Sequence, residues 1–203
     1  SMAHTTTLAG YSRLVDRLNR FPQGAPPSET LYSILKMLFS EKEAELVSRL
    51  PLRPFTAQAA SRVWKMSLGE TRKILDELAD RAVLVDFDQD GHSVYVLPPP
   101  MAGFFEFSLM RVRNEIDQKA LSELYYQYLN VEEDFIRDLF MQGETQLGRT
   151  FVHEPSLPQG NSLHVFDYER SSEVIKNASC RAVSLCYCRH KMHHLGRACD
   201  APP

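Results

Sequence analysis

The stretch from Thr56 to Pro98, TAQAASRVWKMSLGETRKILDELADRAVLVDFDQDGHSVYVLP, decides the fold of this chain. Its first half predicts two helices that begin after Thr56 and Ser67, because small hydroxyl side chains accept hydrogen bonds from the first amides of a helix. In the second of these helices and just beyond it, apolar residues recur at helical spacing and are expected to face inward: Leu68, Ile74, Leu75, Leu78 and Val83. The second half places Asp90-Gly91 between two short apolar runs, a pattern typical of a tight hairpin turn.

Two short helices followed by a β-hairpin resemble the winged-helix fold. The composition agrees with this resemblance, because Ala57, Ala59 and Ala60 leave room for the second helix to pack closely on the first. Three amphipathic segments come before this unit and also predict helices: residues 8–20, a segment that starts at Ser28-Glu29, and residues 41–50.

The segment after the proline run at 98–100 is rich in aromatic residues and methionine, and its periodicity predicts two or three amphipathic helices. Most of their buried surface is expected to come from Phe104, Phe105, Phe107, Met110, Tyr125, Tyr126, Tyr128, Phe135, Leu139, Phe140 and Met141. Further along, strands are expected at 150–154 and 163–166, then a short helix capped by Ser171 or Ser172, then an extended run into the cysteines.

These elements predict a mostly α protein of the α+β class, in which a winged-helix-like domain precedes amphipathic helices and a small α/β cysteine-rich segment. We expect four parts: an N-terminal helix and linker (1–27), the winged-helix-like domain (28–98), a helical segment (99–142) and a C-terminal segment with the cysteine cluster (143–203).

The composition is that of a folded globular protein. Hydrophobic residues make up 43% of the 203 residues and charged residues 24%, and the net charge is -3. This charge favours neither nucleic acid nor an anionic membrane, so any such binding depends on a local patch. No apolar run approaches the roughly 20 residues needed to span a bilayer, and the N-terminus lacks the pattern of a secretory signal. We therefore expect a cytoplasmic protein.

The winged-helix segment offers a weak case for DNA binding. A DNA-reading helix-turn-helix needs basic surfaces on its second helix and wing. Residues 62–81 carry five basic and four acidic side chains, and the hairpin contributes Asp86, Asp88 and Asp90 with no lysine or arginine. A docking or dimerisation role, including a homodimer, is favoured over DNA. The residues that would carry DNA binding are Arg62, Lys65, Arg72 and Lys73.

The C-terminal segment, CYCRHKMHHLGRACDAPP, contains three of the four cysteines: Cys186, Cys188 and Cys199. In an extended backbone, residues two apart point to one side, so Cys186 and Cys188 are expected to face a common centre. Clustered thiolates select zinc, copper(I) or iron–sulfur clusters. Arg189, Lys191 and Arg197 would compensate the net negative charge of a four-thiolate cluster, which favours iron–sulfur over a neutral zinc site.

The same residues resemble the Cys-x-Cys-Arg-His-Lys-x-x-His-x-Gly-x-x-Cys-Asp-Ala-Pro stretch of a family of bacterial ferredoxin-type iron–sulfur proteins, common in anaerobes. The resemblance implies a 4Fe–4S cluster and makes Cys186, Cys188 and Cys199 ligands. In that family a winged-helix-like half precedes the motif, and a further cysteine and ferredoxin motifs follow it. This sequence ends at Pro203, so we expect it to be truncated within the site: the cluster is expected in the full-length protein, with zinc as the alternative and an empty site as a further alternative in a chain of this length.

Several ligands are candidates for completing the coordination. Cys180 is one, although a small buried apolar side chain is the more ordinary role for a lone cysteine. His190, His193 or His194 would instead favour tetrahedral zinc.

The leading hypothesis is an electron-transfer protein that works with a redox partner protein and has no catalytic activity of its own. The alternatives are a redox-responsive DNA-binding regulator and a zinc-binding interaction module.

Overall fold

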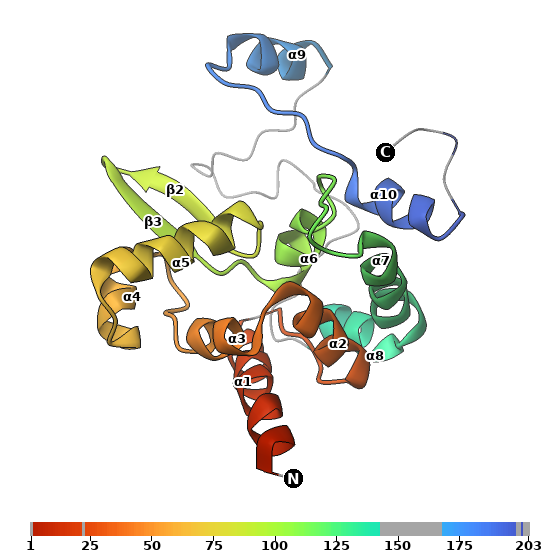
Figure 1. Cartoon of the computed structure of the whole chain (residues 1–203). Helices are drawn as coiled ribbons and strands as arrows, with labels where there is room; N and C mark the ends of the chain where they lie inside the picture. The colour runs from red at the N-terminus through yellow and green to blue at the C-terminus, as the bar shows by residue number, and fades with distance from the viewer. Residues whose placement is uncertain (1, 22, 143–167, 198–199, 201–203) are drawn as a thin grey trace.

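The computed structural model describes residues 2–21, 23–142, 168–197 and 200 of the chain (Figure 1). Three helices come first: α1 (Met2–Leu18), α2 (Glu29–Leu38) and α3 (Glu41–Ser48). The short strand β1 (Phe55–Thr56) leads into α4 (Ala57–Trp64) and α5 (Leu68–Asp80), and the strands β2 (Val85–Gln89) and β3 (His92–Val96) follow.

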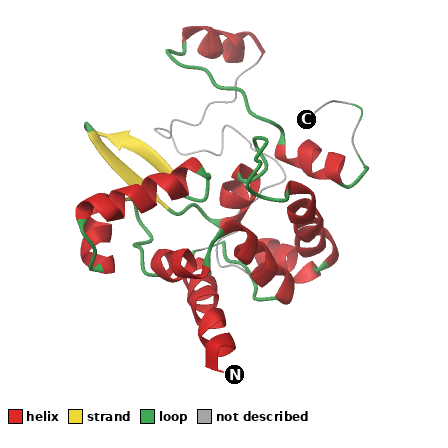
Figure 2. Cartoon of the chain, viewed as in Figure 1, coloured by secondary structure: helices red, strands yellow, loops and turns green. Residues whose placement is uncertain are grey.

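The second half of the described chain is helical, as Figure 2 shows. An irregular turn at Pro100–Phe104 leads into α6 (Phe105–Phe107), and α7 (Gln118–Tyr126) and α8 (Glu133–Arg137) each continue into a wider helical turn, at Gln127–Val131 and Asp138–Gln142. After residues 143–167 come α9 (Tyr168–Asn177) and α10 (Tyr187–His194). The predicted mostly α, α+β class is confirmed.

Local side-chain chemistry explains where many of these helices begin. Ser28, Thr56 and Ser67 each accept a hydrogen bond from an amide in the first turn of the following helix, as the sequence predicts. Before α5 the bond is reciprocal, because the Glu70 carboxylate returns to the Ser67 backbone amide. Each such cap contributes about 1 kcal/mol to helix stability.

The β-hairpin forms as the Asp90-Gly91 pair predicts. Both residues have positive φ, 55° and 78°, which gives the turn the twist that joins two antiparallel strands. Strand β3 lies between β2 and β1 in a three-stranded antiparallel sheet. The strand β1, the helices α4 and α5 and this hairpin together make the winged-helix-like unit.

The buried residues form one cluster that extends from Tyr11 in α1 to Tyr187 in α10. Its centre is aromatic, with Phe105 in ring contact with Phe104, Tyr125, Tyr128 and Phe135 at centroid distances of 5.0–6.2 Å. Leu75, Leu78 and Val83 are buried, as predicted. The core therefore extends beneath α10.

Five apolar residues that were expected inside the core lie elsewhere. Leu68 shares the face of α5 that carries Leu75, but it is the first residue of the helix and lies at the end of that face, where it is 41% exposed. Phe140 and Met141 are also exposed, at the end of the turn that follows α8. Phe107 and Tyr126 are only partly buried.

Two local expectations for the C-terminal segment are wrong, and two are outside the described residues. Helix α9 begins at Tyr168, so Ser171 and Ser172 lie within the helix and do not cap it. The extended run ends at Cys186, because Tyr187 begins α10. The expected strands at 150–154 and 163–166 fall outside the residues that the structure describes.

Candidate metal centre at helix α10

Helix α10 begins inside the cysteine motif, which corrects the extended arrangement expected for Cys186 and Cys188. Cys186 is the N-cap residue, and its carbonyl accepts the first intrahelical bond from the His190 amide at 2.9 Å. A signal for the helix was present, because Tyr187, His190, Lys191 and His194 have helical spacing. The helix ends before Gly196, whose φ of 66° reverses the chain.

One face of α10 is anchored to the helical body by directional contacts. The Tyr187 ring packs edge-on against Tyr125 at a centroid distance of 6.2 Å. The Lys191 ammonium donates to Asn130 Oδ1 at 3.2 Å and lies 5.2 Å from the Tyr187 ring centroid. Beyond the helix, the Arg197 guanidinium donates to the Tyr126 hydroxyl at 2.8 Å.

His190 is the most firmly held of the three histidines. It is buried, and its Nδ1 lies 2.7 Å from the backbone carbonyl oxygen of Leu109. A carbonyl only accepts, so His190 Nδ1 carries a proton and donates it. His190 Nε2 lies 3.1 Å from Nε2 of His194, and His193 is exposed. Burial and the two neighbouring imidazoles lower the pKa of His194, so its ring is neutral at pH 7.

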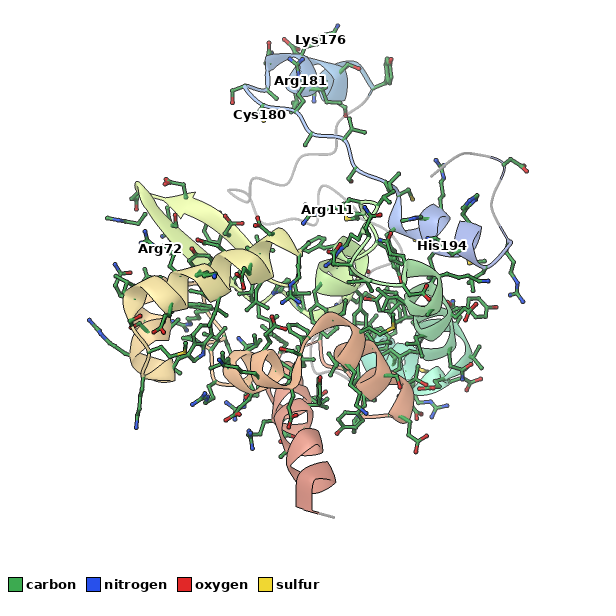
Figure 3. The ribbon with its side chains drawn as sticks, viewed as in Figure 1. Arg72, Arg111, Lys176, Cys180, Arg181 and His194 are labelled. Carbon is green, nitrogen blue, oxygen red and sulfur yellow. The ribbon has the colours of Figure 1, made fainter. Side chains whose placement is uncertain are left out.

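The three cysteines within the described residues lie in two places in the fold. Cys186 and Cys188 are exposed free thiols at the N-terminal end of α10. Cys180 is also exposed, which makes the buried apolar role wrong for it. Figure 3 shows Cys180 beside α9, away from His194 on α10. Cys199 lies outside the described residues.

The N-terminal end of α10 is suited to hold negative charge. The amides of its first turn have no intrahelical acceptor, as in any α-helix, and the N-cap residue Cys186 makes no side-chain capping bond to them. These amides and the helix dipole favour anions such as thiolates at this end. Within the described part of the chain, however, no group of three or more cysteine, histidine or acidic side chains is arranged to hold a metal ion.

The three basic residues of the motif are placed differently from one another. Arg189 and Arg197 are exposed, whereas Lys191 is buried. Burial lowers the pKa of Lys191, and the nearby Cys188 and Glu106 oppose this by favouring the charged form. The Lys191 ammonium is bound to Asn130 in this position.

On the winged-helix-like unit, Arg62, Lys65, Arg72 and Lys73 are all exposed. Lys73 is 4.0 Å from the Glu77 carboxylate. Residues directly opposite in an antiparallel pair share a face of the sheet, and the register places Asp86 opposite Tyr95 and Asp88 opposite Ser93.

The Tyr95 hydroxyl bonds to Asp76 of α5 at 2.6 Å, so this face of the sheet is the one that meets α5. Asp86 and Asp88 thus lie on the face of the sheet that is turned toward α5.

The partners that anchor α10 were not identifiable from sequence patterns. The Leu109 carbonyl lies 81 residues before His190, and Asn130 lies 61 residues before Lys191. Backbone carbonyls and single polar side chains at such separations leave no periodic signal.

Comparisons with protein-family models, with curated proteins and with solved structures found no match for this chain. Among its described residues, no helix has both the length and the apolar character that crossing a membrane requires.

Proposed function

We propose that this chain is a cytoplasmic electron-transfer protein that holds an iron–sulfur cluster at the N-terminal end of α10. The observation that supports the proposal best is the pair of exposed free thiols, Cys186 and Cys188, on the uncapped end of a helix that is anchored to the core. The cluster would supply the redox chemistry, and a partner protein would supply or accept the electron.

The proposed ligands are Cys186, Cys188 and Cys199. A cluster with thiolate ligands is anionic, and hydrogen bonds and nearby positive charge help to set its reduction potential. The first-turn amides of α10 would supply hydrogen bonds, and Arg189, Lys191 and Arg197 are the cations proposed to supply positive charge. Cys180 follows α9 and is left out of the proposed set.

Anaerobic reconstitution of the 203-residue chain with ferrous iron and sulfide tests this proposal. We expect brown protein with absorption near about 400 nm and up to about four iron atoms per chain. Replacing Cys186 and Cys188 by serine should remove most of the bound iron. Cys180→Ser is the matched control and should leave the iron content unchanged, because it removes an equally exposed thiol from a different part of the fold.

Two results would count against the proposal. Equal iron loss in the Cys180→Ser control would show that binding is unspecific. Colourless protein with about one zinc ion per chain, lost with Cys186 and Cys188, would replace the cluster with a zinc-binding interaction module.

DNA binding by the winged-helix-like unit is the weaker alternative. It would depend on Arg62, Lys65, Arg72 and Lys73, and phosphate contacts of this kind weaken steeply with salt. The wing carboxylates oppose it, so we expect the Asp86→Asn, Asp88→Asn double variant to bind a duplex several-fold more tightly than the unchanged chain. Strong, salt-sensitive duplex binding by the unchanged chain would favour the regulator instead.

A further inference from the structure

The His190–His194 pair has a geometry that the proposed cysteine site does not use. The two Nε2 atoms lie 3.1 Å apart, and the ring centroids lie 4.7 Å apart. The residues are four apart on α10, so they share one face of the helix. Both side chains therefore bring the same ring nitrogen, Nε2, to one place beside the helix.

The contact with Leu109 determines which nitrogen of His190 is available. Because Nδ1 of His190 donates to the Leu109 carbonyl, a neutral His190 ring keeps its lone pair on Nε2. Metal-binding histidines are commonly oriented in this way, with the other ring nitrogen donating to a backbone carbonyl or carboxylate. In the structure described here, His194 Nε2–H is left to donate to His190 Nε2.

The separation of the two nitrogens also suits a bound ion. Zinc–imidazole bonds are about 2.0–2.1 Å long, and two of them at an angle of about 98° place their nitrogens about 3.1 Å apart. Only small ring rotations would then be needed to open the angle toward the tetrahedral value. His194 is partly exposed, which leaves a path for the ion and for water ligands.

We propose that His190 and His194 form a second metal site, separate from the cysteines, that binds a divalent first-row cation of the zinc type. The ion would take the place of the hydrogen bond between the rings, with water completing its coordination. His194 would shift its proton to Nδ1 and expose Nε2, so no proton is gained or lost.

The charges around the pair set a limit on the affinity of this site. Lys119 acts on His194 as a positive charge and Asp117 as a negative one, so the two largely oppose each other. The Lys191 ammonium, on the same helix, is bound to Asn130. With two protein ligands, the site should bind zinc more weakly than a site with four.

The test removes the thiols first, so that it is independent of the proposed iron–sulfur site. In the 203-residue chain with all four cysteines replaced by serine, zinc is titrated in competition with a chromophoric chelator. We expect one zinc ion per chain and at least a tenfold weaker affinity in His194→Ala. His193→Ala is the matched control, since it removes an exposed neighbouring imidazole, and it should change the affinity less than threefold.

A second measurement covers the case in which a variant fails to fold. Nitrogen-15 spectra of the histidine rings in the otherwise unchanged all-serine chain should show zinc-dependent shifts at Nε2 of His190 and His194, with Nδ1 of His190 staying protonated. No zinc binding, equal weakening in His193→Ala, or ring shifts confined to other histidines would each overturn the proposal.

Discussion

Helices α5 and α10 both carry several charged or titratable side chains, but the two helices are buried in opposite ways. The face of α5 that enters the core presents Leu75 and Leu78, and its charged side chains extend into water. The buried residues of α10 are Tyr187, His190 and Lys191, whose imidazole and ammonium groups bond to Leu109 and Asn130.

This difference shows how each helix is positioned. Apolar burial is strong but non-directional, so α5 tolerates small shifts as long as its leucines stay covered. A buried imidazole or ammonium group must find its hydrogen-bond partners, and only one placement of α10 satisfies both of them. Directional anchoring of this kind suits a helix that has to present thiols in a fixed orientation.

The largest expected effect is on α5. Replacing Leu75, which is fully buried, by alanine should destabilise the whole chain by about 2–5 kcal/mol, because it removes core contacts and leaves a cavity. Chemical denaturation monitored by circular dichroism measures the change. A loss below about 1 kcal/mol would mean that apolar burial does not hold α5 in place.

Tyr187→Ala should have a smaller and local effect. Burial of an aromatic side chain contributes about 2 kcal/mol, and here it anchors α10 on Tyr125 at the edge of the core. Hydrogen exchange should show lost protection in α10 and little change in α5. An equal loss of protection in both helices would remove the contrast between them.

Tyr95→Phe probes the polar contact that joins the sheet to α5. It removes the hydrogen bond to Asp76 and should cost about 1.5 kcal/mol at neutral pH. Burial and Asp76 raise the pKa of Tyr95 to about 12. The unfolded phenol ionises first, so stability falls between about pH 10 and pH 12. In the variant, this fall in stability should be absent. Thermal unfolding measured between about pH 10 and pH 12 tests the difference.

Tyr187→Phe should have the smallest effect, with the opposite sign. Within the described part of the chain, the buried Tyr187 hydroxyl has no hydrogen-bond partner, and burial raises the pKa of this phenol. Removing an unsatisfied buried hydroxyl is expected to stabilise α10 by up to about 1 kcal/mol. Hydrogen exchange in α10 should slow, and faster exchange would indicate a partner for this hydroxyl.

The sequence predicted the elements whose signals are local. Thr56, Ser67 and Asp90-Gly91 act on backbone groups within three residues, so the two helices and the hairpin follow from short-range chemistry. The aromatic core followed from periodicity, apart from residues at element ends such as Leu68 and Phe140. Helical periodicity predicts the face on which a residue lies, but tertiary packing decides whether another element covers the end of that face.

At the cysteine motif, local residue chemistry and long-range packing supply different parts of the candidate site. The motif's residue types alone indicated metal chemistry, because thiolates and imidazoles are the ligands that zinc, copper and iron–sulfur centres select. The backbone around Cys188 was misjudged as extended, although Tyr187, His190 and His194 have helical spacing. Only the folded chain brings the Leu109 carbonyl to His190 and thereby selects the nitrogen that His190 presents to His194, because that contact depends on packing across 81 residues.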